Sequence, residues 1–104
     1  MNYYRIKAIL HNGRKGKRYT HRTDGKYPNR INRIVKIDER DIVIGAPYFI
    51  QYVKDEYGND YRNMVLTTSY VTDWDYLYED TIYIETYNSI YEFERVDGGI
   101  KENK

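Results

Sequence analysis

Residues 81–94 read TIYIETYNSIYEFE, and this stretch is the clearest local signal of the fold. Ile82 and Ile84 are two positions apart, so both side chains fall on one face of a β-strand. Tyr91 and Phe93 share one face of a second strand in the same way. A loop with an even number of residues places the two sets on the same side of the sheet. The pattern therefore predicts a β-hairpin with one apolar face.

The loop of this hairpin has two alternative positions. A turn at Asn88-Ser89 would set Glu85 opposite Glu92, and like charges in a cross-strand pair are unfavourable. A turn at Tyr87-Asn88 avoids that pair. We therefore expect the chain to reverse at Tyr87-Asn88, and either register places Asn88 at the tip of the hairpin.

The aliphatic composition favours strands throughout the chain. Ile and Val together number 18, whereas Leu and Ala together number five, and β-branched residues fit a pleated sheet better than a helix. Further strands are expected at residues 3–10, 30–38, 48–54 and 62–71. The acidic, aromatic residues 72–80 are expected to form a loop or a short helical turn. Five or six short strands predict a mostly β fold with little helix, either a strongly twisted sheet or a small SH3-like barrel.

The length of 104 residues supports a single domain, because domains commonly have about 100–150 residues. We expect a basic hairpin or loop segment at 1–26, a β core at 27–96 and a flexible tail at 97–104. The chain contains no Cys, which excludes disulfides, thiolate metal ligands and a thiol nucleophile. No apolar run reaches the roughly 18 residues of a membrane span, and the first residues lack the apolar region of a signal peptide. A soluble, unsecreted protein without membrane partners is expected.

The net charge of +1 hides an uneven distribution along the chain. Residues 1–36 contain 11 Lys and Arg and one acid, whereas residues 37–104 contain 6 Lys and Arg and 15 acids. Such a split has two interpretations. The basic part forms a surface that binds phosphates, or it lies against an acidic surface of the same protomer or of a partner.

The residues that could carry chemistry form no recognisable catalytic arrangement. Residues 13–17, Gly-Arg-Lys-Gly-Lys, lack the spacing and the final Ser or Thr of a phosphate-binding P-loop. His11 and His21 lie in the same basic segment, with Asp24 as the one carboxylate near them in sequence. The remaining acids sit beside one another in expected turns, where solvation accounts for them. We expect no enzyme activity, no bound metal and no cofactor.

The 14 tyrosines are the most informative part of the composition. Tyr offers a ring for stacking and a hydroxyl at low entropic cost, which suits protein interfaces and base-bearing ligands. The large aromatics in residues 74–87 exceed what a small monomer leaves in water, so we expect another protomer to bury some of them. In residues 67–69, Thr-Thr-Ser, at least one hydroxyl should face the polar side of a strand. There it would bond either a ligand oxygen or a neighbouring strand.

Several short motifs resemble one known family. They are Tyr27-Pro28-Asn29-Arg30, Leu66-Thr67-Thr68-Ser69-Tyr70-Val71 and Thr86-Tyr87-Asn88-Ser89-Ile90-Tyr91-Glu92-Phe93-Glu94. Over residues 27–96 the chain resembles small proteins of phages and prophages of Gram-positive bacteria. It is most similar to the type 1 Thoeris anti-defence sponge family. The most specific pieces are the T-T-S-x-V strand and the T-x-N-S-x-Y-x-F hairpin.

The resemblance implies a function without catalysis. Members of this family bind a cyclic ADP-ribose signal made by a bacterial TIR-domain enzyme and hold it away from its immune effector. They are symmetric oligomers with ligand pockets between protomers. By resemblance we expect a homo-oligomer in the cytoplasm of the infected bacterial host. Its ligand would be a cyclic nucleotide signal of the glycocyclic ADP-ribose type.

The same resemblance implies roles for particular side chains. Such a ligand contains an adenine, two riboses and a pyrophosphate, which call for aromatic, hydrogen-bonding and cationic partners. Eight residues are expected to contact it: Trp74, Tyr78 and Tyr87 by stacking, Asn88, Ser89 and Thr68 by hydrogen bonds to ribose or base edges, and Arg30 and Arg33 at the phosphates. Asn88 matches the motif of the family best.

Two other functions stay open on the sequence. One is a non-enzymatic β-module that binds nucleic acid or a host defence protein through the basic N-terminal segment. The other is a structural phage component whose aromatic faces serve assembly alone. Salt-dependent binding to nucleic acid would mark the first, and assembly without small-molecule binding would mark the second.

Overall fold

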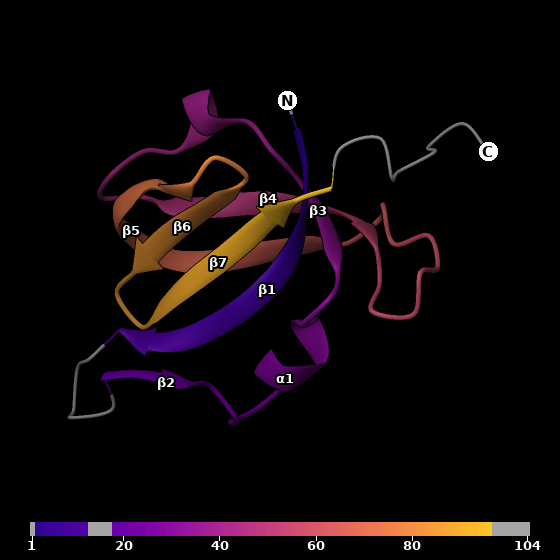
Figure 1. The fold of residues 1–104 in the computed structure, drawn as a ribbon, viewed down its shortest axis with the longest axis horizontal. Coiled ribbons are helices and arrows are strands. Elements are labelled where there is room, and N and C mark those ends of the chain that lie inside the picture. Colours follow the sequence, from indigo (N-terminus) through magenta and orange to yellow (C-terminus); the bar gives the residue numbers. More distant parts are fainter. Residues whose placement is uncertain (1, 13–17, 97–104) are drawn as a thin grey trace.

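Strands account for most of the chain, as the composition predicts. The computed structural model describes residues 2–12 and 18–96 (Figure 1). In chain order the elements are β1 (Asn2–Asn12), β2 (Arg18–His21), the helix α1 (Tyr27–Arg30), β3 (Ile34–Ile37), the 3₁₀-helix η2 (Glu39–Asp41), β4 (Pro47–Lys54), β5 (Val65–Tyr78), β6 (Thr81–Thr86) and β7 (Ser89–Arg95). The predicted mostly β fold with little helix is confirmed. Residues 13–17 of the expected basic segment and the tail expected at 97–104 lie outside the described residues.

Six strands form a closed antiparallel barrel in the order β1-β3-β4-β5-β6-β7, and β7 pairs with β1 to close it. Pairing between β1 and β7 runs from Tyr4 opposite Arg95 to His11 opposite Ser89. β3 and β2 therefore share the other edge of β1, with β3 near its start and β2 near its end (Figure 1). Closure satisfies the backbone hydrogen bonds of the wall internally. Of the two predicted architectures, the small barrel is the one that forms.

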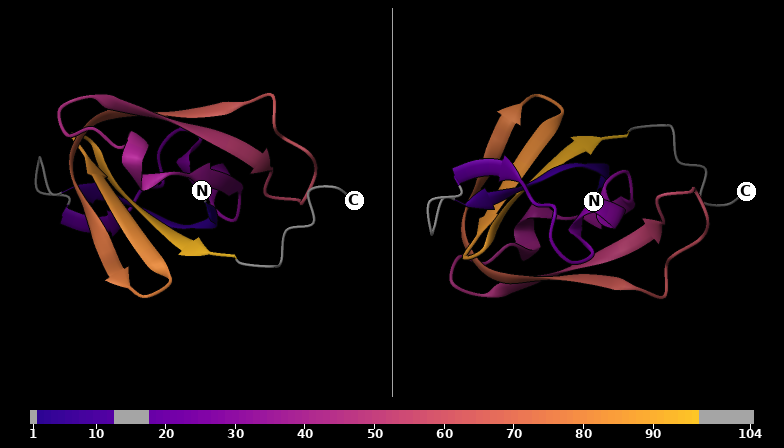
Figure 2. Two further views of the ribbon diagram at one scale, coloured as in Figure 1. Left: turned by 90° about the horizontal axis from the view of Figure 1, so that it is seen from above. Right: turned by 90° about the horizontal axis from the view of Figure 1, so that it is seen from below.

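β5 takes part in two walls of the barrel. Its first part pairs with β4 from Val65 to Tyr70, and its second part pairs with β6 from Val71 to Tyr78. The register of the second pairing shifts between Val71 and Asp73, and irregularities of this kind bend and twist a strand. Figure 2 shows β5 bending from the β4 side to the β6 side. This bend creates the outer wall that carries one of the candidate sites below.

The expectation of a loop or a helical turn at residues 72–80 is wrong, because β5 continues to Tyr78. The physical reason is that this part of the strand is largely in water. Trp74 lies opposite Ile84 of β6 and packs against the core, whereas the other residues from 72 to 78 are exposed. Acidic residues are tolerated in this strand because their side chains stay solvated while the backbone pairs with β6.

The barrel interior is filled by β-branched and aromatic side chains. Its largest fully buried members include Tyr4, Ile6, Ile9, Val35, Ile37, Ile50, Ile82, Ile84 and Phe93. Burying one such side chain contributes about 1.5–3 kcal/mol relative to leaving it exposed. These residues come from all parts of the chain, so the core is completed only when the barrel closes.

The C-terminal hairpin has the predicted register. Glu85 lies opposite Ile90 rather than opposite Glu92. The chain therefore reverses at Tyr87-Asn88, and Asn88 sits at the tip. The predicted position of the turn is confirmed, and so is the reason for it, since the two glutamates are kept from facing one another directly.

The strand expected at residues 30–38 is shorter than predicted. β3 begins at Ile34, and Arg30 belongs to α1. Pro28 favours the helix because its fixed φ suits the first helical turn. Asn32 then takes a φ of 76°, in the left-handed region, as the chain turns toward β3. No helix in the described part of the chain is long and apolar enough to span a bilayer.

Candidate functional site

One candidate site lies where the segment after β2, the helix α1 and the tip of the β6–β7 hairpin meet. The Arg22 backbone N–H donates to the Ile9 carbonyl (2.8 Å) and ties this segment to β1. Tyr27, which begins α1, and Ile31, which follows it, are half-buried and pack against the barrel core. The short helix is therefore docked on the barrel by its own apolar side chains.

Two arginines stack on one aromatic ring at this site. The guanidinium carbon of Arg22 lies 4.0 Å from the centre of the Tyr27 ring, and that of Arg30 lies 4.7 Å from it. Cation–π contacts orient a guanidinium while leaving N–H donors for other partners. Within the described residues Arg30 forms no ion pair, so its charge is open to an anion. We call Arg22, Tyr27 and Arg30 the arginine–tyrosine cluster.

Arg22 connects this cluster to the hairpin tip. Its Nη1 donates to the Ser89 hydroxyl (2.8 Å) and to the Asn88 carbonyl (3.4 Å). Its Nε and Nη2 donate to the Asp24 carboxylate, and these bonds hold the pKa of that carboxyl below its usual value. Asp24 is thus ionised at neutral pH and occupies an anion-binding position at Arg22.

The hairpin tip is fixed to two neighbouring strands. Asn12 of β1 donates through Nδ2 to the Thr86 carbonyl (2.8 Å) and to the Tyr87 carbonyl. The Asn88 backbone N–H donates to the Ser69 hydroxyl of β5 (3.3 Å). These hydrogen bonds hold the backbone of the tip in place. The Asn88 side chain is exposed, so its amide is presented from a fixed backbone.

Tyr91 reaches the cluster from the inside of the barrel. Its side chain is 2% exposed, and its ring stacks on Phe93 at a centroid distance of 6.0 Å. Burial raises the pKa of the Tyr91 hydroxyl to about 12, with Tyr27 adding to the rise and Arg30 opposing it. The hydroxyl therefore stays protonated at neutral pH and keeps both donor and acceptor capacity.

Arg33 is close to the cluster in sequence but has different partners. Its guanidinium carbon lies 5.2 Å from the Tyr52 ring centre and 5.1 Å from that of Tyr61. Its Nε donates to the Glu56 carboxylate (2.9 Å), and its Nη1 donates to the Tyr52 hydroxyl (3.3 Å). Arg33 therefore joins β3 to the connection between β4 and β5, and its charge is already balanced by Glu56.

The structure brings three of the predicted ligand residues together. Asn88, Ser89 and Arg30 meet around Arg22 and Tyr27. Sequence reasoning gave Arg22 and Tyr27 no role, because Ser89 follows Arg22 by 67 residues. The one local signal was the spacing of Tyr27 and Arg30, which are three positions apart and so are neighbours on a helical turn.

The predicted stacking residues are spread along the β5–β6–β7 wall. Tyr87 is 51% exposed and lies in the turn beside Asn88. Tyr78 lies at the opposite end of β6, where it pairs with Thr81. Trp74 lies between them and packs against the core. Of these three aromatics, Tyr87 alone is adjacent to the hairpin tip.

Thr68 uses its hydroxyl within the barrel. Its side chain is 4% exposed. The hydroxyl accepts from the Tyr48 backbone N–H of β4 (3.0 Å) and donates to the Ser69 carbonyl (2.7 Å). The hydroxyls of residues 67–69 are expected to bond either a ligand or a neighbouring strand, and the Thr68 hydroxyl bonds the neighbouring strand β4. Ser69 is the neighbour that reaches the hairpin tip.

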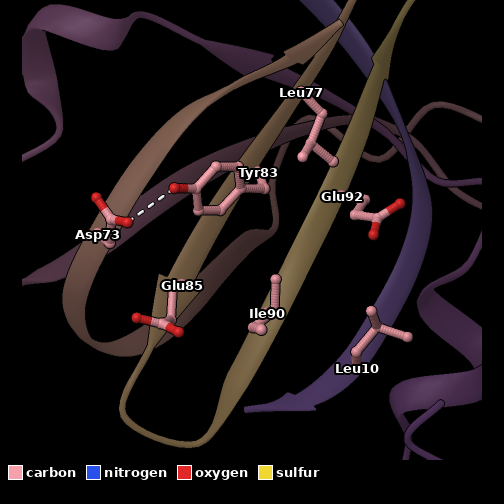
Figure 3. A pocket seen from close by; sticks show the side chains of 7 residues that line it. All are labelled: Leu10, Asp73, Leu77, Tyr83, Glu85, Ile90 and Glu92. Atoms are coloured by element: carbon pink, nitrogen blue, oxygen red, sulfur yellow. Dashed lines mark hydrogen bonds between the residues drawn. The ribbon is translucent and has the colours of Figure 1, made fainter. Parts of the chain in front are cut away.

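A second candidate site is a groove of about 420 Å³ on the outer wall formed by β5, β6, β7 and β1 (Figure 3). It is lined by Leu10, Asp73, Leu77, Tyr83, Glu85, Ile90 and Glu92. Three of these residues are carboxylates and three are aliphatic, so the groove combines apolar surface with negative charge. We call it the acidic groove.

Two of the three groove carboxylates accept hydrogen bonds from hydroxyl groups. The Tyr83 hydroxyl donates to Asp73 (2.7 Å), and the Thr72 hydroxyl donates to Glu85 (2.8 Å). The bond from Tyr83 to Asp73 raises the pKa of Tyr83 to about 12. Within the described residues no Lys or Arg forms an ion pair with Asp73, Glu85 or Glu92. The groove therefore keeps its negative charge and disfavours phosphate groups, whereas the arginine–tyrosine cluster favours them.

Within residues 2–12 and 18–96, no group of three or more His, Asp or Glu side chains is placed to hold a metal ion. Comparisons of the chain with protein-family models, with curated sequences and with solved structures found no match. The function proposed below therefore rests on the chemistry of the arginine–tyrosine cluster and on the motifs quoted above.

Proposed function

We propose that the protein binds and sequesters a cyclic ADP-ribose-type signal without degrading it, as a phage or prophage anti-defence protein that blocks TIR-dependent Thoeris defence. The observation that carries the proposal is the stacking of Arg22 and Arg30 on Tyr27, beside the exposed Asn88. The segment Tyr27–Arg30 and the C-terminal hairpin are two of the motifs that resemble the sponge family. Their meeting at one end of β1 supports a shared role in binding.

The groups of the cluster match the parts of such a ligand. A guanidinium binds phosphate oxygens through a planar fork of N–H donors, and two arginines suit a pyrophosphate. The Asn88 amide offers an acceptor and two donors for ribose hydroxyls or a base edge. Tyr87, half exposed beside it, offers a ring on which a base can stack.

Asp24 fits the role of a group that a ligand phosphate replaces at Arg22. The Asp24 side chain is 51% exposed, whereas that of Arg22 is 13% exposed. An ion pair with one partner in solvent is weak, so exchange of Asp24 for a dianionic ligand costs little. Asp24 is also a poor proton donor at neutral pH because its pKa is lowered by Arg22, which supports binding rather than acid catalysis.

Replacing Arg30 by Ala is expected to weaken binding of cyclic ADP-ribose isomers about tenfold, because one charge-assisted contact to phosphate is lost. Isothermal titration calorimetry with enzymatically prepared isomers measures the effect. Arg40→Ala is the matched control, since it removes the same charge from η2. That helix follows β3, whose last residue pairs with Asn2 at the start of β1, whereas the cluster segment bonds to Ile9 farther along β1. After heat denaturation, mass spectrometry should find the released nucleotide unchanged.

Three results would contradict this proposal. They are a cleaved nucleotide after release, equal weakening by Arg30→Ala and Arg40→Ala, and no binding of any cyclic ADP-ribose isomer. Steeply salt-dependent binding of DNA or RNA in place of the nucleotide would instead favour the alternative of a basic nucleic-acid-binding module.

The proposal includes assembly into a homo-oligomer. Phe49 on β4 is 65% exposed, and Val65 and Tyr70 on β5 are 47% and 59% exposed. Large apolar side chains gathered on one wall are typical of protein interfaces. Phe49→Ser is expected to give a smaller species in sedimentation velocity, while Tyr57→Ser, in a turn outside this wall, should leave the assembly unchanged. Identical sedimentation of all three proteins would exclude this wall as the interface.

A further inference from the structure

Part of the apolar surface that lines the acidic groove is exposed. Leu10 comes from β1, Leu77 from β5 and Ile90 from β7, and Figure 3 shows the side chains spread along one open face. Leu77 is 45% exposed and Leu10 is half-buried, whereas Ile90 is buried. A volume of about 420 Å³ is within the range of sites that take several side chains of a ligand or peptide.

Two of the three groove carboxylates have an apolar or aromatic neighbour across the β6–β7 pair. Glu85 of β6 lies opposite Ile90 of β7, and Tyr83 of β6 lies opposite Glu92 of β7. Asp73 of β5 lies opposite Glu85 on the other side of β6, so two carboxylates face one another there. An occupant that matches the groove therefore needs cationic groups for the carboxylates beside apolar groups for the aliphatic side chains.

The charge around the groove extends beyond its lining. Residues 65–95 contain seven acids and one Arg. Of the acids outside the groove, Glu94 pairs with Arg5 of β1. The wall as a whole thus creates a negative potential, and the groove focuses it over an apolar surface. A purely apolar occupant would bury carboxylates without partners, which is costly.

We propose that the acidic groove is a docking site for an extended, basic segment of a partner protein, anchored by apolar side chains. In an extended chain, side chains on one face are about 6.5–7 Å apart, so a segment with alternating Lys and Leu on that face offers both cations and apolar anchors to the groove. The carboxylates supply charge complementarity, and Leu10 and Leu77 supply apolar contact. This site does not depend on the proposed nucleotide function.

A second copy of the chain is a poorer match for the groove. In a two-fold symmetric pair the same surface meets itself. Two copies meeting at the groove would bring the carboxylates of both walls together with no cation between them. A partner segment of opposite charge avoids this repulsion. Its association also depends on salt concentration, which can be measured.

The test uses a fluorescent peptide in which Lys-Ser-Leu-Ser repeats, titrated with the full protein by fluorescence anisotropy. Binding is expected to be about tenfold weaker for the double variant Glu85→Gln/Glu92→Gln, because two charge contacts are lost. Leu77→Ser should weaken it as well, since it removes an apolar anchor that the fold does not bury. Glu79→Gln is the matched control: Glu79 is an exposed acid in the turn between β5 and β6 that does not line the groove, and its removal should leave binding within twofold.

Several outcomes would overturn the proposal. One is equal affinity for a peptide in which Ser replaces every Leu, since this would reduce the effect to non-specific charge attraction. Another is the same loss of affinity for Glu79→Gln as for Glu92→Gln. A change in sedimentation of Glu85→Gln/Glu92→Gln without loss of peptide binding would identify a second copy as the occupant. Absence of peptide binding at low salt would also exclude the proposal, whatever the result for cyclic nucleotides.

Discussion

Replacing Phe93 by Ala is expected to lower the free energy of unfolding by about 3–5 kcal/mol, the usual range for Phe→Ala in a packed core. Phe93 is fully buried and lies opposite Ile82 of β6 and Ile6 of β1. Its ring also stacks on Tyr91. A closed barrel cannot collapse into the vacated space without shifting paired strands, so most of the cavity should persist. A typical domain is stable by about 5–15 kcal/mol, and this substitution therefore removes a large share of the total.

Urea denaturation followed by circular dichroism measures this effect. Tyr57→Ala is the control, because Tyr57 is 83% exposed and its removal should change stability by no more than about 0.5 kcal/mol. If Phe93→Ala does not fold, Phe93→Leu should show a smaller loss of the same sign. Equal denaturation midpoints for the Phe93 variants and the control would mean that Phe93 is not a core residue.

Alkaline pH is expected to remove about 3 kcal/mol of stability through Tyr91 alone, since each unit of pKa difference is worth about 1.4 kcal/mol. Burial raises the pKa of Tyr91 from 10.0 to about 12. The folded state therefore holds this proton more tightly than the unfolded state does. The stabilisation is complete below pH 10 and is lost progressively as the pH rises through 12.

Urea midpoints at a series of pH values from neutral to strongly alkaline test this dependence. Tyr91→Phe should flatten the decline, because a phenyl ring has no proton to lose. Tyr57→Phe, at an exposed position, should keep the slope of the parent protein. Parallel curves for all three proteins would show that another group controls alkaline unfolding. Tyr76 and Tyr83 also have pKa values raised to about 12, by bonds to Glu39 and Asp73, and ionise in the same interval.

The parts of the fold that the sequence predicts well are those decided by neighbouring residues. The hairpin of residues 81–94 follows from a period of two and from one unfavourable glutamate pair, and its register is confirmed. The strand at residues 72–78 was not predicted, because the many acidic residues of this segment indicated a loop. Asp73, Trp74 and Asp75 do alternate in the manner of a strand with one wet face. Residues 75–78 are all exposed, so this period ends at Asp75 and does not predict the full length of β5.

The candidate sites depend on contacts that no local pattern contains. Arg22 reaches Ser89 across 67 residues, and the acidic groove combines Leu10 with residues of the last three strands. Sequence analysis did place Arg30 and Asn88 in one site, through the resemblance of their motifs. It could not assign Arg22 to this site. The contact of Arg22 with the hairpin tip forms only when the barrel closes and brings β1 and β7 together.

That closure also sets a condition on how the protein is made. β1 leaves the ribosome well before β7, its neighbour along one whole edge. During this interval the edge of β1 that faces β7 has unpaired N–H and C=O groups, a template for strand addition by other chains. Contacts between distant parts of a chain also form slowly. The nascent chain is therefore exposed to aggregation until residue 95 has emerged, and slower synthesis would lengthen this period.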